Sequence, residues 1–365
     1  MGNSGIRSTR RRATLAISAA LVVSALVGGA NAGTAMAQSP AEQTVSASRH
    51  AAPTYQVTSA ALTGGLYQSA YSQRHDDLWV TAASGTTSQL LKVDPRTLTV
   101  EKSITPPVTD TATGAVEAVY GVAVDDRNDT VWTTNTRNNS VAVYSQRTGK
   151  HLATFPGVRH SREVVVDEAR NRAYATALAD GSVVVFDTRT LKEIRRVHVE
   201  GSSPAGLTVD QRTGTVYATD LSKERLIVVS PKASVEPRFI PVAGGSLLDV
   251  ALDRTGRTAY VADLKNGRVT VVDVRTGTTE RTLETGAGTI SVATDPRSGL
   301  LYVGLQTSGT TKVVNPRTGA TVAELATGAK TNHVTVTPRG VFAVDKSSAR
   351  GSGDPDSIHR ITFGR

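Results

Sequence analysis

A sequence unit of about 42 residues that recurs seven times limits what this chain can fold into. Each unit carries an aromatic residue shortly after an apolar segment, at Trp79, Trp132, Tyr174, Tyr217, Tyr260, Tyr302 and Phe342. Successive spacings are 53, 42, 43, 43, 42 and 40 residues, and the long first step contains an insertion at residues 105–114. Periods of this size are typical of repeat architectures in which every unit buries its faces against its neighbours.

Two polar motifs recur in the same phase as the aromatic residues. An Asp lies seven residues before the aromatic in five units, at Asp125, Asp167, Asp210, Asp253 and Asp295. Repetition in so many units favours a hairpin-capping role over a catalytic one. A second motif with Arg-Thr at its centre predicts another turn and supplies Arg96, Arg147, Arg189, Arg275 and Arg317. These arginines are either solvated turn residues or a basic ring for an anionic polymer.

Each unit divides into four short strands separated by turn residues. In the fifth unit the predicted strands are 248–252, 258–262, 269–273 and 279–283. The first strand is apolar, so we expect it to be central and buried on both faces, whereas the polar fourth strand belongs at the rim. Four-stranded units of this length are typical of propeller blades. The sequence therefore predicts an all-β fold, a seven-bladed β-propeller of four-stranded antiparallel blades.

The last unit supplies only three strands, at 334–336, 341–344 and 358–363. Residues 55–62 form a spare strand-like segment at the other end of the domain. We expect this N-terminal strand to complete the last blade and close the ring. An open solenoid would need capping repeats, and neither end of the repeat region resembles one.

The first 53 residues differ from the repeats. Residues 1–37 combine a basic start, an apolar run at 13–27 and an Ala35-Met36-Ala37 cleavage site, which predicts a signal peptide. Arg11–Leu15 fits a twin-arginine signal and an ordinary basic region equally well. Residues 38–53 resemble a linker, leaving 54–365 as the propeller domain. We therefore expect a secreted or extracytoplasmic protein, soluble after cleavage and without a membrane span, because no second long apolar run follows.

Composition excludes several kinds of site. The chain contains no Cys, which rules out disulfides, thiolate metal ligands, a thiol nucleophile and a lipid-modified N-terminal Cys. Without the predicted signal peptide there are 37 basic and 32 acidic residues, a net charge of +5. This mild excess permits contact with a polyanion without demanding it.

The repeat resembles a known type. Tyr260–Asp263 (YVAD), followed by Asn266–Asp273 (NGRVTVVD) and Thr276-Gly277, is similar to the YVTN repeat of YncE-like bacterial seven-bladed propellers. The resemblance covers about residues 55–363. It extends to the repeats of archaeal surface-layer proteins, to lactonase-type propellers and to the heavy chain of quinohaem amine dehydrogenases. It implies the fold, and single-stranded DNA binding becomes a candidate activity because some YncE-like proteins have it.

Ligands of propellers usually bind where the loops entering the first strands converge at the central channel. Four residues before each repeated Asp position lies a mostly polar ring: Gln68, Gly121, Glu163, Gly206, Asp249, Ser291 and His333. Two residues later lies a small, mostly apolar ring: Ala70, Ala123, Val165, Thr208, Ala251, Ala293 and Thr335. Alternation along a strand places both rings on one face. The predicted ligand site at the channel mouth comprises Glu163, Asp249, His333, Asn332, Arg162, His160, Tyr120 and Gln68. The alternative is a solvated channel rim.

No familiar catalytic motif is present: the sequence lacks a G-x-S-x-G elbow, an H-E-x-x-H pair and a phosphate-binding glycine loop. We expect no catalytic residues and no cofactor, and a monomeric, non-enzymatic binding scaffold for a macromolecule or small ligand. One alternative is a lactonase-like hydrolase that uses a divalent metal on Glu163, Asp249 and His333. These residues come from three separate blades and would have to reach across the channel. A second alternative is a protein that binds single-stranded DNA or another anionic polymer.

Overall fold

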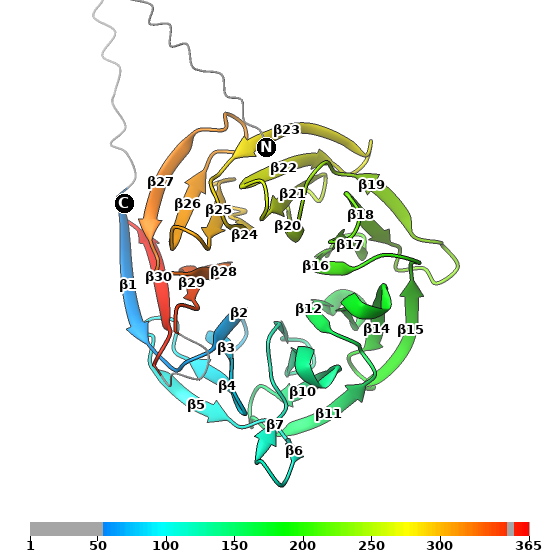
Figure 1. Ribbon diagram of the computed structural model, residues 1–365, viewed down its shortest axis with the longest axis vertical. Coiled ribbons are helices and arrows are strands. Elements are labelled where there is room, and N and C mark those ends of the chain that lie inside the picture. The colour runs from blue at the N-terminus through cyan, green and yellow to red at the C-terminus, as the bar shows by residue number, and fades with distance from the viewer. Residues whose placement is uncertain (1–53, 349–353, 365) are drawn as a thin grey trace, which may run out of the picture. The chain divides into compact units, whose positions relative to one another are not determined.

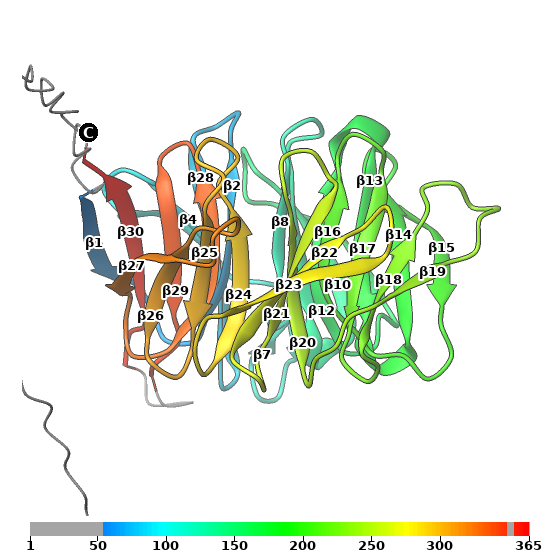
Figure 2. The same ribbon diagram turned by 90° about the horizontal axis from the view of Figure 1, so that it is seen from above.

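The computed structural model describes residues 54–348 and 354–364, and the statements below concern these residues. The predicted signal peptide and linker, residues 1–53, lie outside them. The described chain forms seven four-stranded antiparallel sheets arranged as a ring (Figure 1). Figure 2 shows the ring from its edge, with neighbouring sheets side by side. The predicted all-β, seven-bladed propeller is confirmed.

Blades 1 to 3 follow the order of the chain, each from the innermost strand outwards. Blade 1 consists of β2 (Leu66–Ser72), β3 (Asp77–Ser84), β4 (Thr87–Val93) and β5 (Val100–Ile104). Blade 2 consists of β8 (Val122–Asp125), β9 (Thr130–Asn135), β10 (Ser140–Ser145) and β11 (His151–Pro156). Blade 3 consists of β12 (Ser161–Asp167), β13 (Arg172–Ala177), β14 (Ser182–Asp187) and β15 (Lys192–His198). Short 3₁₀ turns are η1 (Thr136–Asn138), η2 (Glu168–Arg170) and η3 (Leu178–Asp180).

Blades 4 to 6 repeat this order. Blade 4 consists of β16 (Pro204–Asp210), β17 (Thr215–Asp220), β18 (Arg225–Val229) and β19 (Arg238–Pro241). Blade 5 consists of β20 (Leu247–Leu252), β21 (Thr258–Asp263), β22 (Arg268–Asp273) and β23 (Thr278–Glu284). Blade 6 consists of β24 (Thr289–Thr294), β25 (Leu301–Leu305), β26 (Thr310–Val314) and β27 (Thr321–Ala326). In blade 5 the four predicted strands agree with the structure to within one residue at each end.

Blade 7 is built from both ends of the described chain. Its inner strands are β28 (Thr331–Thr337), β29 (Gly340–Asp345) and β30 (Ser357–Phe363). Its outermost strand is β1 (Tyr55–Ala61), which pairs antiparallel with β30 from Tyr55↔Phe363 to Ala61↔Ser357. The predicted insertion between blades 1 and 2 forms a small hairpin of β6 (Val108–Asp110) and β7 (Ala115–Val116), which projects from the ring (Figure 1).

The second strand of each blade, not the first, is the most deeply buried. All six residues of β9 are buried, whereas in β8 the two middle residues are only half-buried. The expectation that the first strand is buried on both faces is therefore wrong. One face of that strand lines the central channel, and the second strand has blades on both of its faces. The exposed β23 confirms a polar fourth strand at the rim.

The core consists of seven apolar clusters, one between each pair of neighbouring blades. The repeated aromatic residue of each blade belongs to the cluster shared with the following blade. Trp132 of blade 2, for example, packs with Val164 and Phe186 of blade 3, and Phe342 of blade 7 packs with Leu78 of blade 1. The aromatic residue recurs every 42 residues because each interface needs one large apolar side chain.

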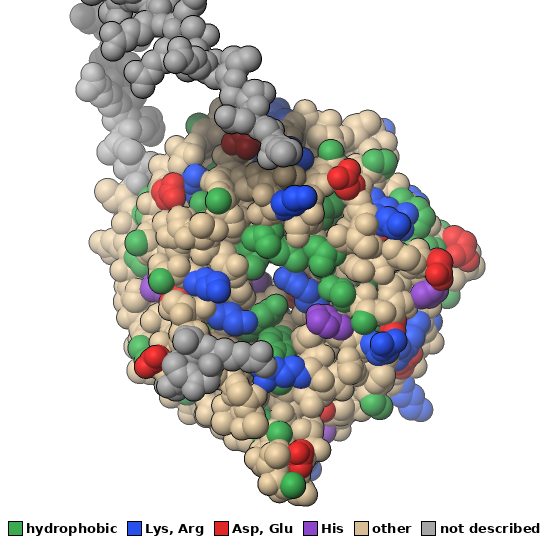
Figure 3. All heavy atoms as spheres, viewed as in Figure 1, with side chains coloured by type: hydrophobic (Ala, Val, Ile, Leu, Met, Phe, Trp, Pro, Cys, Tyr) green, Lys and Arg blue, Asp and Glu red, His purple; other side chains and the backbone are tan. Residues whose placement is uncertain are grey.

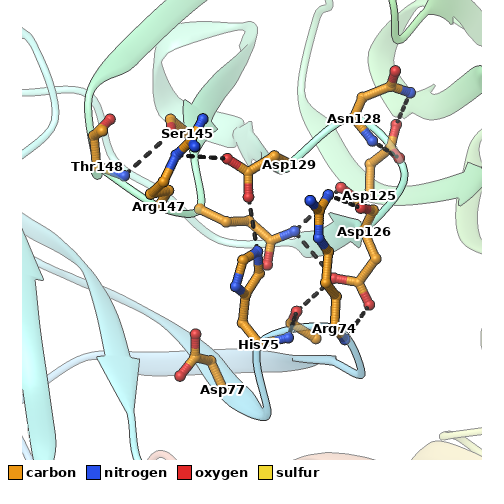
Figure 4. A network of polar contacts seen from close by, with 12 residues as sticks. Arg74, His75, Asp77, Asp125, Asp126, Asn128, Asp129, Ser145, Arg147 and Thr148 are labelled. Atoms are coloured by element: carbon orange, nitrogen blue, oxygen red, sulfur yellow. Dashed lines mark hydrogen bonds and ion pairs between the residues drawn. The ribbon is translucent and has the colours of Figure 1, made fainter.

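The repeated Asp residues cap turns, as predicted. Asp125 Oδ1 accepts the Asn128 N–H at 2.9 Å, and Asp253 Oδ1 accepts the Arg257 N–H at 2.8 Å. Neighbouring turns on this side of the ring are also joined by side chains, as Figure 4 shows for blades 1 and 2. There Asp126 Oδ2 accepts the N–H of Arg74 at 3.1 Å, and His75 Nε2 lies 2.8 Å from Asp129 Oδ1. This network holds two blades together at their turns.

Candidate functional site: the central channel

The predicted polar ring lies inside the channel and divides it into two unequal ends. We call the side on which the first strands begin the front face, which is toward the viewer in Figures 1 and 3, and the opposite side the back face. Glu163, Asp249 and His333 line a cavity of 670 Å³ that reaches the back face, and also a space of 10 Å³ toward the front. The ring is thus the floor of the larger cavity and not the outermost layer of a mouth.

Glu163 is reached from a blade that is not its neighbour. The Gln68 Nε2 of blade 1 donates to Glu163 Oε2 of blade 3 at 2.8 Å. Gly121 of blade 2 stands between them, and a Cβ there would lie 2.6 Å from the Arg162 carbonyl and 3.3 Å from Gln68 Oε1. Burial, reinforced by the negative charge of Asp249, raises the pKa of Glu163 to about 7.

Asp249 has a structural task that its place in the sequence did not reveal. Its Oδ1 accepts the N–H of Val250 at 2.8 Å. Its Oδ2 accepts the Ser291 hydroxyl and the Val292 N–H, both at 3.0 Å. This carboxylate therefore joins blade 5 to blade 6, a structural role that neither the predicted ligand site nor the alternative of a solvated rim included.

His333 closes the ring between blades 7 and 1. Its Nδ1 lies 3.4 Å from the Ser69 N–H, which donates to it, so in the neutral ring the proton is on Nε2. Burial lowers the pKa of His333 to about 4; Asp249 opposes the shift and Arg162 adds to it. The imidazole is therefore neutral at neutral pH.

The front opening of the channel is basic and aromatic. The rings of Tyr67 and Tyr120 meet edge to face, with centroids 5.0 Å apart. Lys346 Nζ lies 4.3 Å from the Tyr67 centroid, and the Arg137 guanidinium lies 5.7 Å from that of Tyr120. Lys and Arg side chains surround the central opening in Figure 3. We call this group the front cluster: Tyr67, Tyr120, Arg137, Arg162, Lys330 and Lys346.

The cations of the front cluster lie close enough to influence one another. Burial lowers the pKa of Lys346 to about 8, and Lys330, Arg137 and Arg162 lower it further while Asp356 opposes them. Among the residues that the structure describes, no carboxylate lies within 4.0 Å of the four cationic groups of this cluster. Among the described residues the cluster therefore has no salt bridge, and the charge of Asp356 offsets part of its positive charge.

The structure distributes the eight predicted site residues over different depths. Gln68, Glu163, Asp249 and His333 form the ring, and Arg162 and Asn332 lie one layer further forward beside it. Asn332 Nδ2 donates to the Tyr67 carbonyl at 2.7 Å. Tyr120 belongs to the front cluster, and the exposed His160 lies in a loop with a φ of 52°.

Three of the four cations of the front cluster are not among the predicted site residues: Arg137, Lys330 and Lys346. They lie in or next to loops that leave the second strand or precede the first strand. The 42-residue period gives equivalent positions along the first strands but none for these loops. Counting basic residues beyond the ends of the second strands would have found Arg137 and Lys346.

Glu163, Asp249 and His333, the residues named for a divalent metal, come from blades 3, 5 and 7. Among residues 54–348 and 354–364, no group of three or more His, Asp or Glu side chains is arranged to hold a metal ion. Asp249 and His333 are instead engaged with backbone N–H groups of the following blades. Within the same residues, no helix is long and apolar enough to cross a membrane.

Fold and repeat together define a seven-bladed β-propeller, and its repeats resemble the YVTN type. The chain is similar to the uncharacterized protein YncE of Escherichia coli O157:H7 and of Escherichia coli K12. Each match is 28% identical over 159 residues, covering 40% of this chain and 43% of YncE, so it spans less than half the length of these relatives. No family model matches the chain.

A solved structure extends the comparison over most of the chain. Hydrazine synthase of Kuenenia stuttgartiensis has a TM-score of 0.64 and 17% sequence identity, covering 83% of this chain and 96% of that one. At this identity the similarity shows the fold alone, because propellers with one architecture host unrelated functions.

Proposed function

We propose that the protein is an exported, non-enzymatic binding propeller that holds an anionic partner on the front cluster of its channel. One observation carries the proposal: four cations from blades 2, 3 and 7 converge beside two tyrosines without a neutralising carboxylate at salt-bridge distance among the described residues. Like charges held close together repel one another, and an anion would relieve that repulsion. Export rests on the sequence pattern of residues 1–37.

Partly buried Lys346 makes the cluster more than an ordinary basic surface. Solvent-exposed cations are screened by water and salt, so they interact weakly with anions. Burial is the main cause of the lowered pKa of Lys346; Asp356 opposes the shift, and the neighbouring cations add to it. A bound anion would stabilise the charged ammonium and raise that pKa. Tyr67 and Tyr120 add apolar surface beside the charge.

The experiment compares two pairs of substitutions with the same change in charge. Lys330→Gln with Lys346→Gln removes two charges from the front cluster, and Arg189→Gln with Arg275→Gln removes two from exposed turns at the rim. Binding of polyglutamate and of an oligodeoxythymidine is measured by fluorescence anisotropy over a range of salt concentrations. We expect at least a tenfold loss for the front pair and less than a twofold change for the rim pair.

The salt dependence separates the remaining alternatives. For the oligodeoxythymidine, loss of two phosphate contacts should reduce the log–log salt slope by roughly 1.4. Binding of the oligonucleotide but not of polyglutamate would favour single-stranded DNA as the partner. Equal losses for the two pairs would show that net charge, not the front cluster, governs binding. Failure of wild-type protein to bind either polymer at low salt would refute the proposal.

A metal-dependent hydrolase is not proposed, because the two residues Asp249 and His333 are committed to fastening blades.

A further inference from the structure

The larger cavity of the channel lies on the opposite side of the ring from the front cluster. Its volume is 670 Å³, and all seven blades contribute to its lining. A space of this size fits a small organic molecule. Part of its wall is the mostly apolar small ring predicted from the sequence, and polar side chains such as Gln73, Gln211 and Arg212 line the cavity nearer its opening; the ring comprises Ala70, Ala123, Val165, Thr208, Ala251, Ala293 and Thr335.

The floor of this cavity is acidic. Glu163 and Asp249 both line it, and the third polar side chain of the floor, His333, is neutral at neutral pH. Arg162, whose charge acts on Glu163, lies in the layer toward the front face. At the back rim the charges balance, since Arg212 Nη2 lies 3.4 Å from Asp210 Oδ2 and Arg254 follows Asp253. The floor therefore sets the sign of the potential inside the cavity.

Blade fastening does not explain why Glu163 is acidic. In the ring, Gln68, Asp249, Ser291 and His333 each accept an N–H from the inner strand of the next blade. Glu163 makes no such bond to blade 4; its own N–H donates to the Thr176 hydroxyl at 3.0 Å, and that hydroxyl reaches the Ala205 carbonyl of blade 4 at 3.3 Å. A glutamine at this position would meet the same structural demands without the cost of burying a second carboxylate.

We propose that the back cavity binds a small organic cation with an apolar body, whose charged head lies on the floor beside Glu163 and Asp249. The walls contact the apolar body, and the two carboxylates stabilise the head. An alkylammonium ion is the simplest molecule with this combination. The inference is independent of the front cluster, which selects the opposite charge at the other end of the channel.

Binding of a cation has a consequence for the proton on Glu163. A positive charge beside this carboxyl favours its ionised form. At pH 6.5, below the raised pKa of about 7, part of the protein carries a proton there, which the cation would displace. The side chains that act on Glu163 are Asp249, Gln68 and Arg162, and His333 lines the same cavity with a pKa lowered to about 4.

The test is isothermal titration calorimetry of the purified protein with hexylammonium, hexanol and hexanoate at pH 6.5, in two buffers of different ionisation enthalpy. We expect hexylammonium to bind at least tenfold more tightly than either analogue and to release a fraction of a proton. Ammonium ion alone should bind at least tenfold more weakly, because it lacks the apolar body. Equal binding of hexanol, preference for hexanoate, or equal binding of ammonium would overturn the proposal.

Variants locate the site. Glu163→Gln should weaken hexylammonium binding at least tenfold and abolish proton release, and Thr208→Phe should block the cavity from a different blade. Lys330→Gln with Lys346→Gln should leave hexylammonium binding within twofold of wild type, which separates this site from the front cluster. Circular dichroism melts report whether each variant is folded. Unchanged binding in folded Glu163→Gln or Thr208→Phe protein would refute the assignment.

Discussion

Neighbouring blades are fastened near the channel in one way in blades 1 to 4 and in another way in blades 5 to 7. In blades 1 to 4 the second strand carries a buried threonine whose hydroxyl accepts the N–H of the ring residue: Thr81, Thr134, Thr176 and Thr219. Three of these hydroxyls also donate to a carbonyl of the next blade: Tyr120, Arg162 and Ala205. In these blades a group behind the channel wall thus joins neighbouring blades, and in blade 1 the ring residue Gln68 also accepts the Val122 N–H of blade 2 at 3.3 Å.

Blades 5 to 7 have no such hydroxyl. The corresponding residues of their second strands are Ala262, Gly304 and Val344, each paired directly with the ring residue of its own blade. Here the ring side chains reach the next blade themselves, as Asp249 does to Val292, Ser291 to Val334 and His333 to Ser69. The channel-lining atoms are therefore part of the fastening.

This difference divides the side chains of the polar channel ring into those that join blades and those that are free to contact a ligand. Where a threonine does the fastening, the ring position is free to be glycine, as at Gly121 and Gly206, or to carry a side chain such as Glu163. Where it does not, the ring residue is committed. A polar channel therefore indicates a ligand site only where its polar side chains are not already hydrogen-bonded to the backbone of the next blade.

The largest expected effect is at Asp249. Asp249→Ala leaves the N–H groups of Val250 and Val292 and the Ser291 hydroxyl without their acceptor, which should lower the free energy of unfolding by about 3 kcal/mol. Urea denaturation measures this loss, and Asp249→Asn, which retains one acceptor oxygen, should lose less. A loss below about 1 kcal/mol in the alanine variant would contradict a fastening role.

The second-largest loss of stability is expected when a side chain is added at Gly206. A Cβ there would lie 2.4 Å from the Leu248 carbonyl and 2.7 Å from the Asp249 Cα, so Gly206→Ala must displace backbone and should cost about 2–3 kcal/mol. Gly304→Ala is the matched control, because its Cβ would meet only side-chain atoms, the nearest at 3.3 Å. Equal thermal stabilities for the two variants would argue against close blade contact at position 206.

A smaller loss is expected for Thr134→Val, which keeps the shape of the side chain and removes its hydroxyl. The Gly121 N–H and the Arg162 carbonyl both lose a partner, at an expected cost of about 2 kcal/mol. Thr219→Val serves as the comparison and should cost about 1 kcal/mol, because its hydroxyl accepts the Gly206 N–H and, among the described residues, donates to no carbonyl of blade 5. The order of the two midpoints in urea checks the prediction, and the reverse order would contradict it.

The smallest effect on stability at pH 8 is expected for Glu163→Gln, within about 1 kcal/mol, because Thr176 does the fastening in blade 3. Its dependence on pH is more informative. The raised pKa of Glu163 means that the folded state binds more protons than the unfolded state between pH 4.5 and about 7, so this group makes stability fall as pH rises. The lowered pKa of His333 makes stability rise between about pH 4 and 6.5.

These two contributions oppose each other in wild-type protein. Glu163→Gln should therefore reveal a rise in unfolding free energy from pH 4.5 to 6.5, and His333→Asn a fall, each by less than about 1.4 kcal/mol per pH unit. Urea denaturation at several pH values, read as differences from wild type, checks both signs. Identical pH profiles for the three proteins would show that neither group titrates as described.

The repeat was enough to predict the ring, the blade composition and the turn-capping Asp residues, because spacing alone places equivalent residues on equivalent strands. It also placed Glu163, Asp249 and His333 in one layer. It could not show that Asp249 fastens blade 6, because that depends on Ala262 lacking a hydroxyl in a different strand. Nor could it indicate that the larger hollow opens at the back face, since the taper of the channel depends on how the blades tilt.

The pairing of β1 with β30 has a consequence for how the molecule is made. Tyr55 is among the first residues of the domain to be synthesised, yet its partner Phe363 is among the last. β1 therefore has no strand to pair with until β30 has been synthesised. An exposed strand of this kind can pair with another chain, so the interval before the final residues emerge is when the newborn protein is most prone to associate with its own copies.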